Sequence, residues 1–147
     1  MQRTQPTRSA LSEPWFDACN EGRLLLQKCS SCGAYQFYPR ILCTHCGARD
    51  PQWVEASGAG RIASFTVVRR AVSKAYEAPY VVALVDLEEG PRLMTNIVDC
   101  APEAVRIGAR VGVRFDSWGD DVDLPVFTLN TADTRSDDSE PKEDVTP

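Results

Sequence analysis

The 147-residue sequence is poor in the residues that enzymes combine for catalysis. It has one histidine, His45, which lies between two cysteines of a C-x-x-C motif. Nucleophilic and acid–base catalysis need a nucleophile beside a base, or carboxylates held in different environments. Cys100 has only Asp99 as a sequence neighbour that titrates, and glycine-rich phosphate loops and dinucleotide fingerprints are absent. The sequence therefore predicts a protein that is not an enzyme by itself.

Long hydrophobic runs and an excess of positive charge are also missing. No apolar run approaches the roughly 20 residues of a membrane helix, and the N-terminus has no signal-peptide core, so a cytoplasmic protein is expected. The net charge is −5, of which −4 falls in residues 131–147. A nearly neutral body lacks the basic surface that grips nucleic-acid phosphates.

What the sequence does have is a repeated C-x-x-C-G motif. Cys29 and Cys32 form the first pair, and Cys43 and Cys46 form the second. A tight turn presents both thiolates of such a pair to one ion, and two turns complete a tetrahedron around zinc. Since all four coordination positions are then filled by protein, a structural Zn²⁺ site is predicted.

Two other states of these cysteines remain open on spacing alone. Two disulfides are possible, although a reducing cytoplasm disfavours them. Iron in a rubredoxin-like site also accepts four sulfur ligands, but no partner redox motif accompanies it. His45 is interpreted as an exposed turn residue, because four thiolates already complete the site.

The N-terminal segment is predicted to be an arm followed by a helix. Residues 1–12 are polar and without hydrophobic periodicity, which predicts a flexible arm. Ser12 is expected to cap a helix over residues 13–21, with Pro14 in its first turn and Gly22 just after its end.

Short extended segments surround the two cysteine pairs. They cover residues 23–28, 34–38 and 53–55. The alternation of strand and knuckle predicts a helix and rubredoxin-like zinc ribbon over residues 13–57, stabilised largely by its metal.

Beyond residue 57 the sequence is typical of a small β-barrel. Strands are predicted over residues 61–69, 80–87, 92–98, 111–115 and 126–129, with a helical turn at 102–105. In the first strand Ile62, Ser64, Thr66 and Val68 are expected to share one face. Five strands with this insertion predict a five-stranded OB-fold barrel over residues 58–130, and a small sandwich is the alternative. Residues 131–147 are acidic and are predicted to be a disordered tail.

Two segments are candidates for binding. Arg69, Arg70 and Lys74 lie between the first two barrel strands, in a loop that flanks the ligand face of OB folds. They are candidate contacts for phosphate groups, and a solvated charged loop is the alternative. Residues 37–40 carry two aromatic side chains, which either form a docking surface or pack against the barrel beside Trp53.

The order of motifs resembles one protein family. The segments that carry the resemblance are residues 15–16, 22–29, 38–40, 53–54, 58–68, 79–85, 89–94 and 107–108. Together they are similar to the zinc-ribbon and OB-fold family of acyl-CoA-associated proteins, long labelled a domain of unknown function. The similarity extends over residues 13–129.

The resemblance implies a small non-catalytic subunit of a thiolase or thiolase-like aldolase complex. A thiolase-fold partner would supply the chemistry, and acyl-CoA would be a possible bound ligand. The resemblance implies zinc ligation by the four cysteines of the C-x-x-C-G motifs. On this reading Arg69, Arg70 and Lys74 are candidate contacts for the phosphates of coenzyme A.

Two further functions are alternatives. A single-stranded nucleic-acid binder would use both folds, but the near-neutral body and acidic tail argue against it. An independent acyl-CoA hydrolase or dehydratase would need an acid–base constellation that the sequence does not provide. The first hypothesis is therefore the accessory subunit, with a protein partner and acyl-CoA, and without nucleic acid or membrane.

Overall fold

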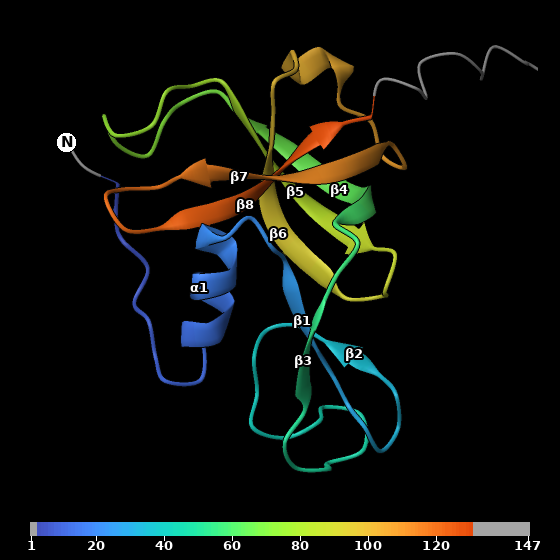
Figure 1. The fold of residues 1–147 in the computed structure, drawn as a ribbon. Helices are drawn as coiled ribbons and strands as arrows, with labels where there is room; N and C mark the ends of the chain where they lie inside the picture. The colour runs from blue at the N-terminus through green and yellow to red at the C-terminus, as the bar shows by residue number, and fades with distance from the viewer. Residues whose placement is uncertain (1–2, 131–147) are drawn as a thin grey trace, which may run out of the picture.

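The computed structural model describes residues 3–130, and the acidic segment 131–147 lies outside the described residues. The chain forms a zinc-ribbon-like lower part and a closed barrel above it, with one helix beside both (Figure 1). The elements are α1 Glu13–Asn20, β1 Leu25–Lys28, β2 Tyr35–Gln36, β3 Gln52–Glu55, β4 Ala59–Val68, β5 Tyr80–Leu87, β6 Arg92–Val98, the 3-10 turn η1 Pro102–Ala104, β7 Arg110–Ser117 and β8 Asp123–Leu129. Within residues 3–130, no helix has the length and apolar character needed to cross a membrane.

Helix α1 forms where it was predicted, but its first turn is held differently. Ser12 already has near-helical backbone angles and makes no capping bond. Its hydroxyl accepts a hydrogen bond from the Ser9 N–H at 2.9 Å, and the Ser9 carbonyl accepts one from the Glu13 N–H at 2.8 Å. The prediction that Ser12 caps the helix was therefore wrong, because a preceding turn that begins at Ser9 uses its side chain.

The lower part is a three-stranded antiparallel sheet in the order β2-β1-β3. Strand β1 pairs with β3 over four residue pairs, and with β2 over two. Only Ala56, Ser57 and Gly58 separate β3 from the first barrel strand. A Cβ at Gly58 would lie 2.3 Å from a methyl of Val113, so a residue without a side chain lets this connection pass close to β7.

The barrel is closed in the order β4-β5-β6-β8-β7, with β7 pairing back onto β4. Strand β5 shows the cleanest pattern, since alternate residues are buried along its whole length. The β6–β8 contact is the one parallel pairing in the described barrel and covers two residue pairs. The closed five-stranded barrel confirms the predicted OB-type fold and excludes a sandwich.

A β-bulge between Ile62 and Ser64 makes the inward and outward faces of β4 differ from those predicted. Ile62 is buried, but Ser64 and Thr66 are exposed, while Phe65 and Val67 pack against the core. The extra residue in the bulge reverses which side of the strand faces inward. A prediction of one continuous alternation was wrong for this reason.

One hydrophobic core runs through the whole molecule. It begins in the barrel with side chains such as Val85 and Phe127 and continues through Leu26 to Trp15 and Cys19 on α1. Asn20 joins the helix to the barrel by donating to the Asp121 carbonyl at 3.1 Å and accepting from the Asp123 N–H at 2.8 Å. Helix α1 therefore contacts both the ribbon and the barrel and connects the two.

Candidate metal centre

The two C-x-x-C-G segments fold into turns with the same hydrogen bonds. In the first, the Gly33 N–H donates to the Cys29 carbonyl at 2.8 Å, and in the second the Gly47 N–H donates to the Cys43 carbonyl at 2.9 Å. Gly33 and Gly47 have φ angles of 74° and 76°, a region that glycine adopts without steric cost. The repeated motif thus produces a repeated knuckle.

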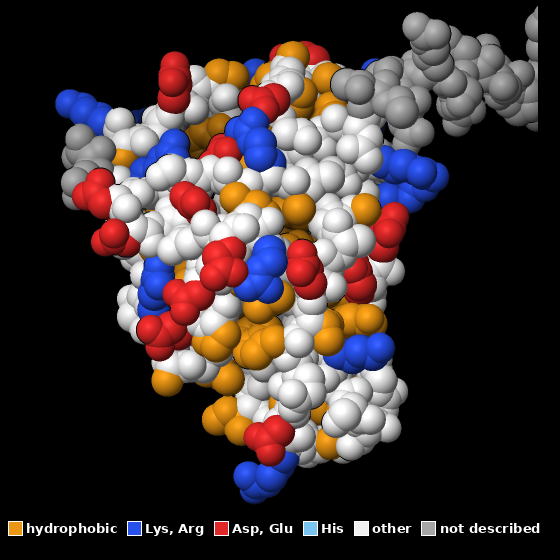
Figure 2. All heavy atoms as spheres, viewed as in Figure 1, with side chains coloured by type: hydrophobic (Ala, Val, Ile, Leu, Met, Phe, Trp, Pro, Cys, Tyr) orange, Lys and Arg blue, Asp and Glu red, His pale blue; other side chains and the backbone are white. Residues whose placement is uncertain are grey.

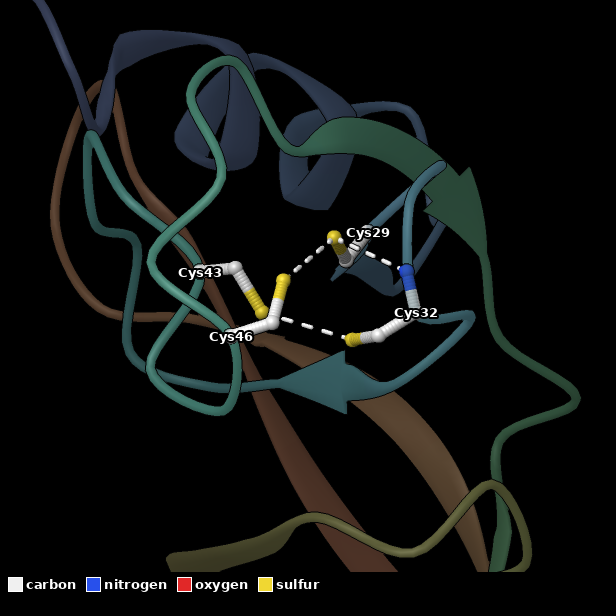
Figure 3. A group of neighbouring side chains, drawn as sticks. All are labelled: Cys29, Cys32, Cys43 and Cys46. Atoms are coloured by element: carbon white, nitrogen blue, oxygen red, sulfur yellow. Dashed lines mark hydrogen bonds between the residues drawn. The ribbon is translucent and has the colours of Figure 1, made fainter.

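The knuckles bring the four cysteine sulfurs together at the ribbon (Figure 3). All four atoms lie within 4.8 Å of one another. The Cys29 and Cys46 sulfurs are 3.6 Å apart, and those of Cys32 and Cys43 are 3.7 Å apart. Four sulfurs placed tetrahedrally about 2.3 Å from a zinc ion would be about 3.8 Å apart, so the geometry fits this metal.

The surroundings of the sulfurs favour their charged forms at two positions. The Cys32 N–H, which donates to the Cys29 sulfur at 3.5 Å, is the main cause that lowers the pKa of Cys29 to about 6. The N–H groups of Cys46 and His45 similarly lower the pKa of Cys43. At the other two positions the pKa is raised, that of Cys46 to about 12 by its contact with the Cys29 sulfur and that of Cys32 by burial and by Cys43. Thiolates are the form that binds metal, so a cation at the centre would be needed to hold all four cysteines in that form.

This geometry does not contain the two alternative disulfides, and it leaves His45 outside the site. All six cysteines are free thiols in the structure, so the two disulfides are not formed. His45 is exposed, and its Nδ1 lies 3.4 Å from the Thr44 hydroxyl, outside the group of four sulfurs. The centre is a four-sulfur site.

Two buried glutamines, which no motif of the sequence singles out, hold the second knuckle in place. Gln27 accepts from the Arg40 N–H at 2.8 Å and donates to the Arg40 carbonyl at 3.0 Å. Gln36 accepts from the Thr44 N–H at 2.8 Å and donates to the Leu42 carbonyl at 3.2 Å. Their side chains also bond to each other at 2.8 Å. In the sequence these glutamines are only two polar residues on predicted strands, and polar residues on strands usually face the surface. Nothing local therefore indicates that they are buried.

The basic loop is separate from the metal centre. Arg69, Arg70 and Lys74 are exposed. The loop between β4 and β5 that carries them lies at the other end of the molecule from the strands β2 and β3 of the ribbon (Figure 1). The ring centre of Tyr76 in the same loop lies 6.0 Å from the ring centre of Trp118, which belongs to the turn between β7 and β8. The structure thus joins two loops that flank OB ligand faces, while the role of the three cations stays a prediction.

The N-terminal arm packs on that turn, a contact that the sequence did not predict. The Arg3 guanidinium lies 4.5 Å from the centre of the Trp118 ring, and the Trp118 indole N–H donates to the Thr4 carbonyl at 3.0 Å. Gln5 donates to the Trp118 carbonyl at 3.1 Å. These contacts fix the position of Trp118 at the edge of the barrel.

The remaining cysteines are poor nucleophiles. Burial raises the pKa of the Cys19 thiol to about 12, and burial together with Asp99 raises that of Cys100. Both are therefore neutral thiols at physiological pH. Among residues 3–130, neither of these two cysteines has a histidine beside it, so neither is an activated nucleophile.

Comparison with known proteins places the chain in a family. Residues 16–52 match the family model "ChsH2, rubredoxin-like zinc ribbon domain", and residues 53–116 match "ChsH2, C-terminal OB-fold domain". The chain belongs to the ChsH2 family of zinc-ribbon and OB-fold proteins. The family match and the four close cysteines support a structural zinc.

Individual relatives agree with this assignment. A "DUF35 domain-containing scaffold protein" of Methanothermobacter thermautotrophicus is 41% identical over 90 residues, which are 60% of this chain and 68% of that protein. A "probable enoyl-CoA hydratase alpha subunit" of Thermomonospora curvata is 39% identical over 125 residues, or 85% of this chain. The chain spans only 39% of the length of that second protein.

Solved structures show the same fold. The structure described as "Ltp2-ChsH2(DUF35) aldolase" contains a chain that is 38% identical, with a TM-score of 0.79 over 85% of this chain and 98% of that one. A DUF35 protein of Sulfolobus solfataricus, described as of unknown function, is 19% identical with a TM-score of 0.60, which supports the fold alone. The ChsH2 ribbon and barrel therefore recur as one unit.

Proposed function

We propose that this ChsH2-family chain is a non-catalytic, zinc-binding accessory subunit of a thiolase or thiolase-like aldolase complex that acts on acyl-CoA thioesters. The observation that carries the proposal is the likeness to the chain in the Ltp2-ChsH2 aldolase structure, nearly all of which this chain covers. The catalytic residues would come from the partner, because the described residues provide a saturated four-sulfur site and two neutral thiols.

The proposed zinc ligands are Cys29, Cys32, Cys43 and Cys46. The bound ion would supply structure rather than chemistry, because four protein sulfurs leave no position for water or substrate. The ion would thereby hold the two knuckles of the ribbon together. The tip of the ribbon and the side of the barrel would be exposed for contact with a partner protein.

Coenzyme A binding is a finer part of the proposal. Arg69, Arg70 and Lys74 are exposed and close in sequence, and their side chains suit the phosphate groups of a nucleotide. The enoyl-CoA hydratase name of the Thermomonospora curvata relative belongs to a longer protein. We therefore assign no hydratase activity to this chain.

Co-expression with an Ltp2-type aldolase or thiolase from the same host tests the proposal. We expect the two proteins to co-elute in size-exclusion chromatography, and the enzyme to lose activity or solubility without this chain. Independent elution of both proteins, with full activity of the enzyme alone, would contradict the proposal. Zinc content, measured by mass spectrometry under native conditions, should be one ion per chain.

A further inference from the structure

A small hollow lies where the ribbon, helix α1 and the barrel meet. Its volume is about 190 Å³. Figure 2 shows hydrophobic side chains gathered on this face, between the barrel and the ribbon. The walls of the hollow include Trp15, Tyr38, Met94, Thr95 and Trp118. No residue that lines it is Asp, Glu, Lys, Arg or His.

The hollow combines exposed and buried apolar groups. Met94 on β6 is 63% exposed and Tyr38 is 52% exposed, although both are large hydrophobic side chains. Trp15 is 9% exposed, and its indole N–H is the one buried side-chain polar atom in residues 3–130 without a hydrogen-bond partner. Aromatic residues and methionine at such a depression are typical of anchor sites in protein interfaces.

The walls of the hollow are fixed before any partner arrives. Trp118 is held by the N-terminal arm, through the bond to the Thr4 carbonyl and the stacked Arg3 guanidinium. Thr95 is buried, and its hydroxyl donates to the Pro125 carbonyl at 3.2 Å, which ties β6 to β8 at the base. A pre-formed pocket costs little ordering entropy when it is filled.

The size and polarity of the hollow select its occupant. Small-molecule sites usually measure about 300–1,000 Å³, so a hollow of about 190 Å³ is too small for an acyl-CoA and suits one inserted side chain. Residues 131–147 of this chain carry six acidic and two basic side chains and no aromatic residue, which is a poor match to an uncharged aromatic pocket. Strand β6 is the third barrel strand, and its face is a common binding face of OB folds.

We infer that this hollow is the docking pocket for a single apolar side chain of the catalytic subunit. The inference rests on the proposed function and adds the place of contact. The partner surface is hydrophobic at its centre, with an uncharged anchor that enters between Tyr38 and Met94. The ribbon and barrel contribute jointly, because Tyr38 follows β2 and Met94 lies on β6.

The experiment replaces an exposed side chain at the mouth of the hollow by a charge. Full-length Met94→Asp is co-expressed with the Ltp2-type aldolase of the same host, and binding is measured by co-elution and by titration. The matched controls are Val72→Asp and Ile107→Asp, since these side chains are 79% and 71% exposed in other loops. We expect at least a tenfold loss of affinity for Met94→Asp and a change below twofold for the controls.

Each outcome distinguishes the inference from the proposed function. Equal binding by Met94→Asp and the controls would overturn the docking pocket while the accessory role stands. A wild-type chain that does not bind the aldolase would refute the proposed function, and the inference with it. A Met94-dependent homodimer of the isolated chain, seen by light scattering, would overturn the inference in favour of self-association. Circular dichroism and zinc content verify that each variant folds.

Discussion

The two buried glutamines of the ribbon allow a specific stability prediction. Replacing Gln36 by leucine keeps the approximate size of the side chain but removes four bonds, which join it to the Thr44 N–H, the Thr44 hydroxyl, the Leu42 carbonyl and Gln27. The Thr44 hydroxyl is on an exposed residue and can bond to water instead. At about 1 kcal/mol for each of the other three bonds, the loss is about 3 kcal/mol, from which the extra apolar contact of leucine subtracts about 1 kcal/mol. We expect Gln36→Leu to destabilise the ribbon by about 2 kcal/mol.

The assay follows both unfolding and release of the proposed metal. Urea unfolding monitored by tryptophan fluorescence gives the free energy of unfolding, with Trp53 on β3 reporting the ribbon and Trp15 and Trp118 reporting the helix and the barrel edge. The rate of zinc release to a chromogenic chelator reports the integrity of the second knuckle, because Gln36 binds the backbone of Leu42 and Thr44 on either side of Cys43. We expect faster release from Gln36→Leu than from the wild type.

A matched control comes from the same ribbon. Gln52 on β3 is exposed, and its side chain donates only to the Asp50 carbonyl at 2.9 Å. Gln52→Leu should therefore change stability by less than about 0.5 kcal/mol. If Gln36→Leu unfolded at the same urea concentration as Gln52→Leu and released zinc at the wild-type rate, the glutamine pair would have no role in holding the knuckle.

Three further predictions concern the barrel, the helix and the metal. Gly60→Ala should cost about 1–3 kcal/mol in thermal or urea unfolding, because its Cβ would lie 2.6 Å from the Asp86 carbonyl oxygen, whereas Gly112→Ala, with its nearest atom at 3.4 Å, should cost less. The pKa of Cys19, raised to about 12, favours the neutral thiol in the fold, so its contribution is fully present below the ordinary thiol pKa of about 9 and is lost as the pH rises toward 12. Unfolding midpoints at pH 8 and 10.5 should therefore fall less in Cys19→Ala than in the wild type. Chelation of the proposed zinc should abolish amide protection in β1–β3 while β5 and β6 keep theirs, as measured by hydrogen exchange.

The sequence predicted the elements whose signals are local. The C-x-x-C-G spacing sets the knuckles because each turn needs only its own residues and a glycine with positive φ. Strand β5 was also predictable, since its alternating burial follows from one uninterrupted β-branched run. Strand β8 was predicted too short, because Pro125 lies inside it and proline normally argues against a strand.

What could not be predicted depends on residues that are distant in sequence. Gln27 and Gln36 are core residues only because residues 40–44 return over them with unpaired backbone groups. The polar arm was expected to be flexible, yet Arg3 meets the ring of Trp118, more than 100 residues later. Such contacts leave no periodicity in the sequence.

The closure of the barrel has a mechanical consequence. Strands β7 and β8 share seven residue pairs, but β7 joins β4 through three pairs and β8 joins β6 through two. The two strands of the β7–β8 hairpin are thus paired more extensively with each other than with the rest of the barrel. The turn of this hairpin is hydrogen-bonded to the N-terminal arm and to Asn20 of the helix. The arm and helix α1, both in the N-terminal part of the chain, therefore restrain the turn of this hairpin, so loss of the arm contacts would loosen the β7–β8 hairpin and leave the four cysteines of the ribbon in place.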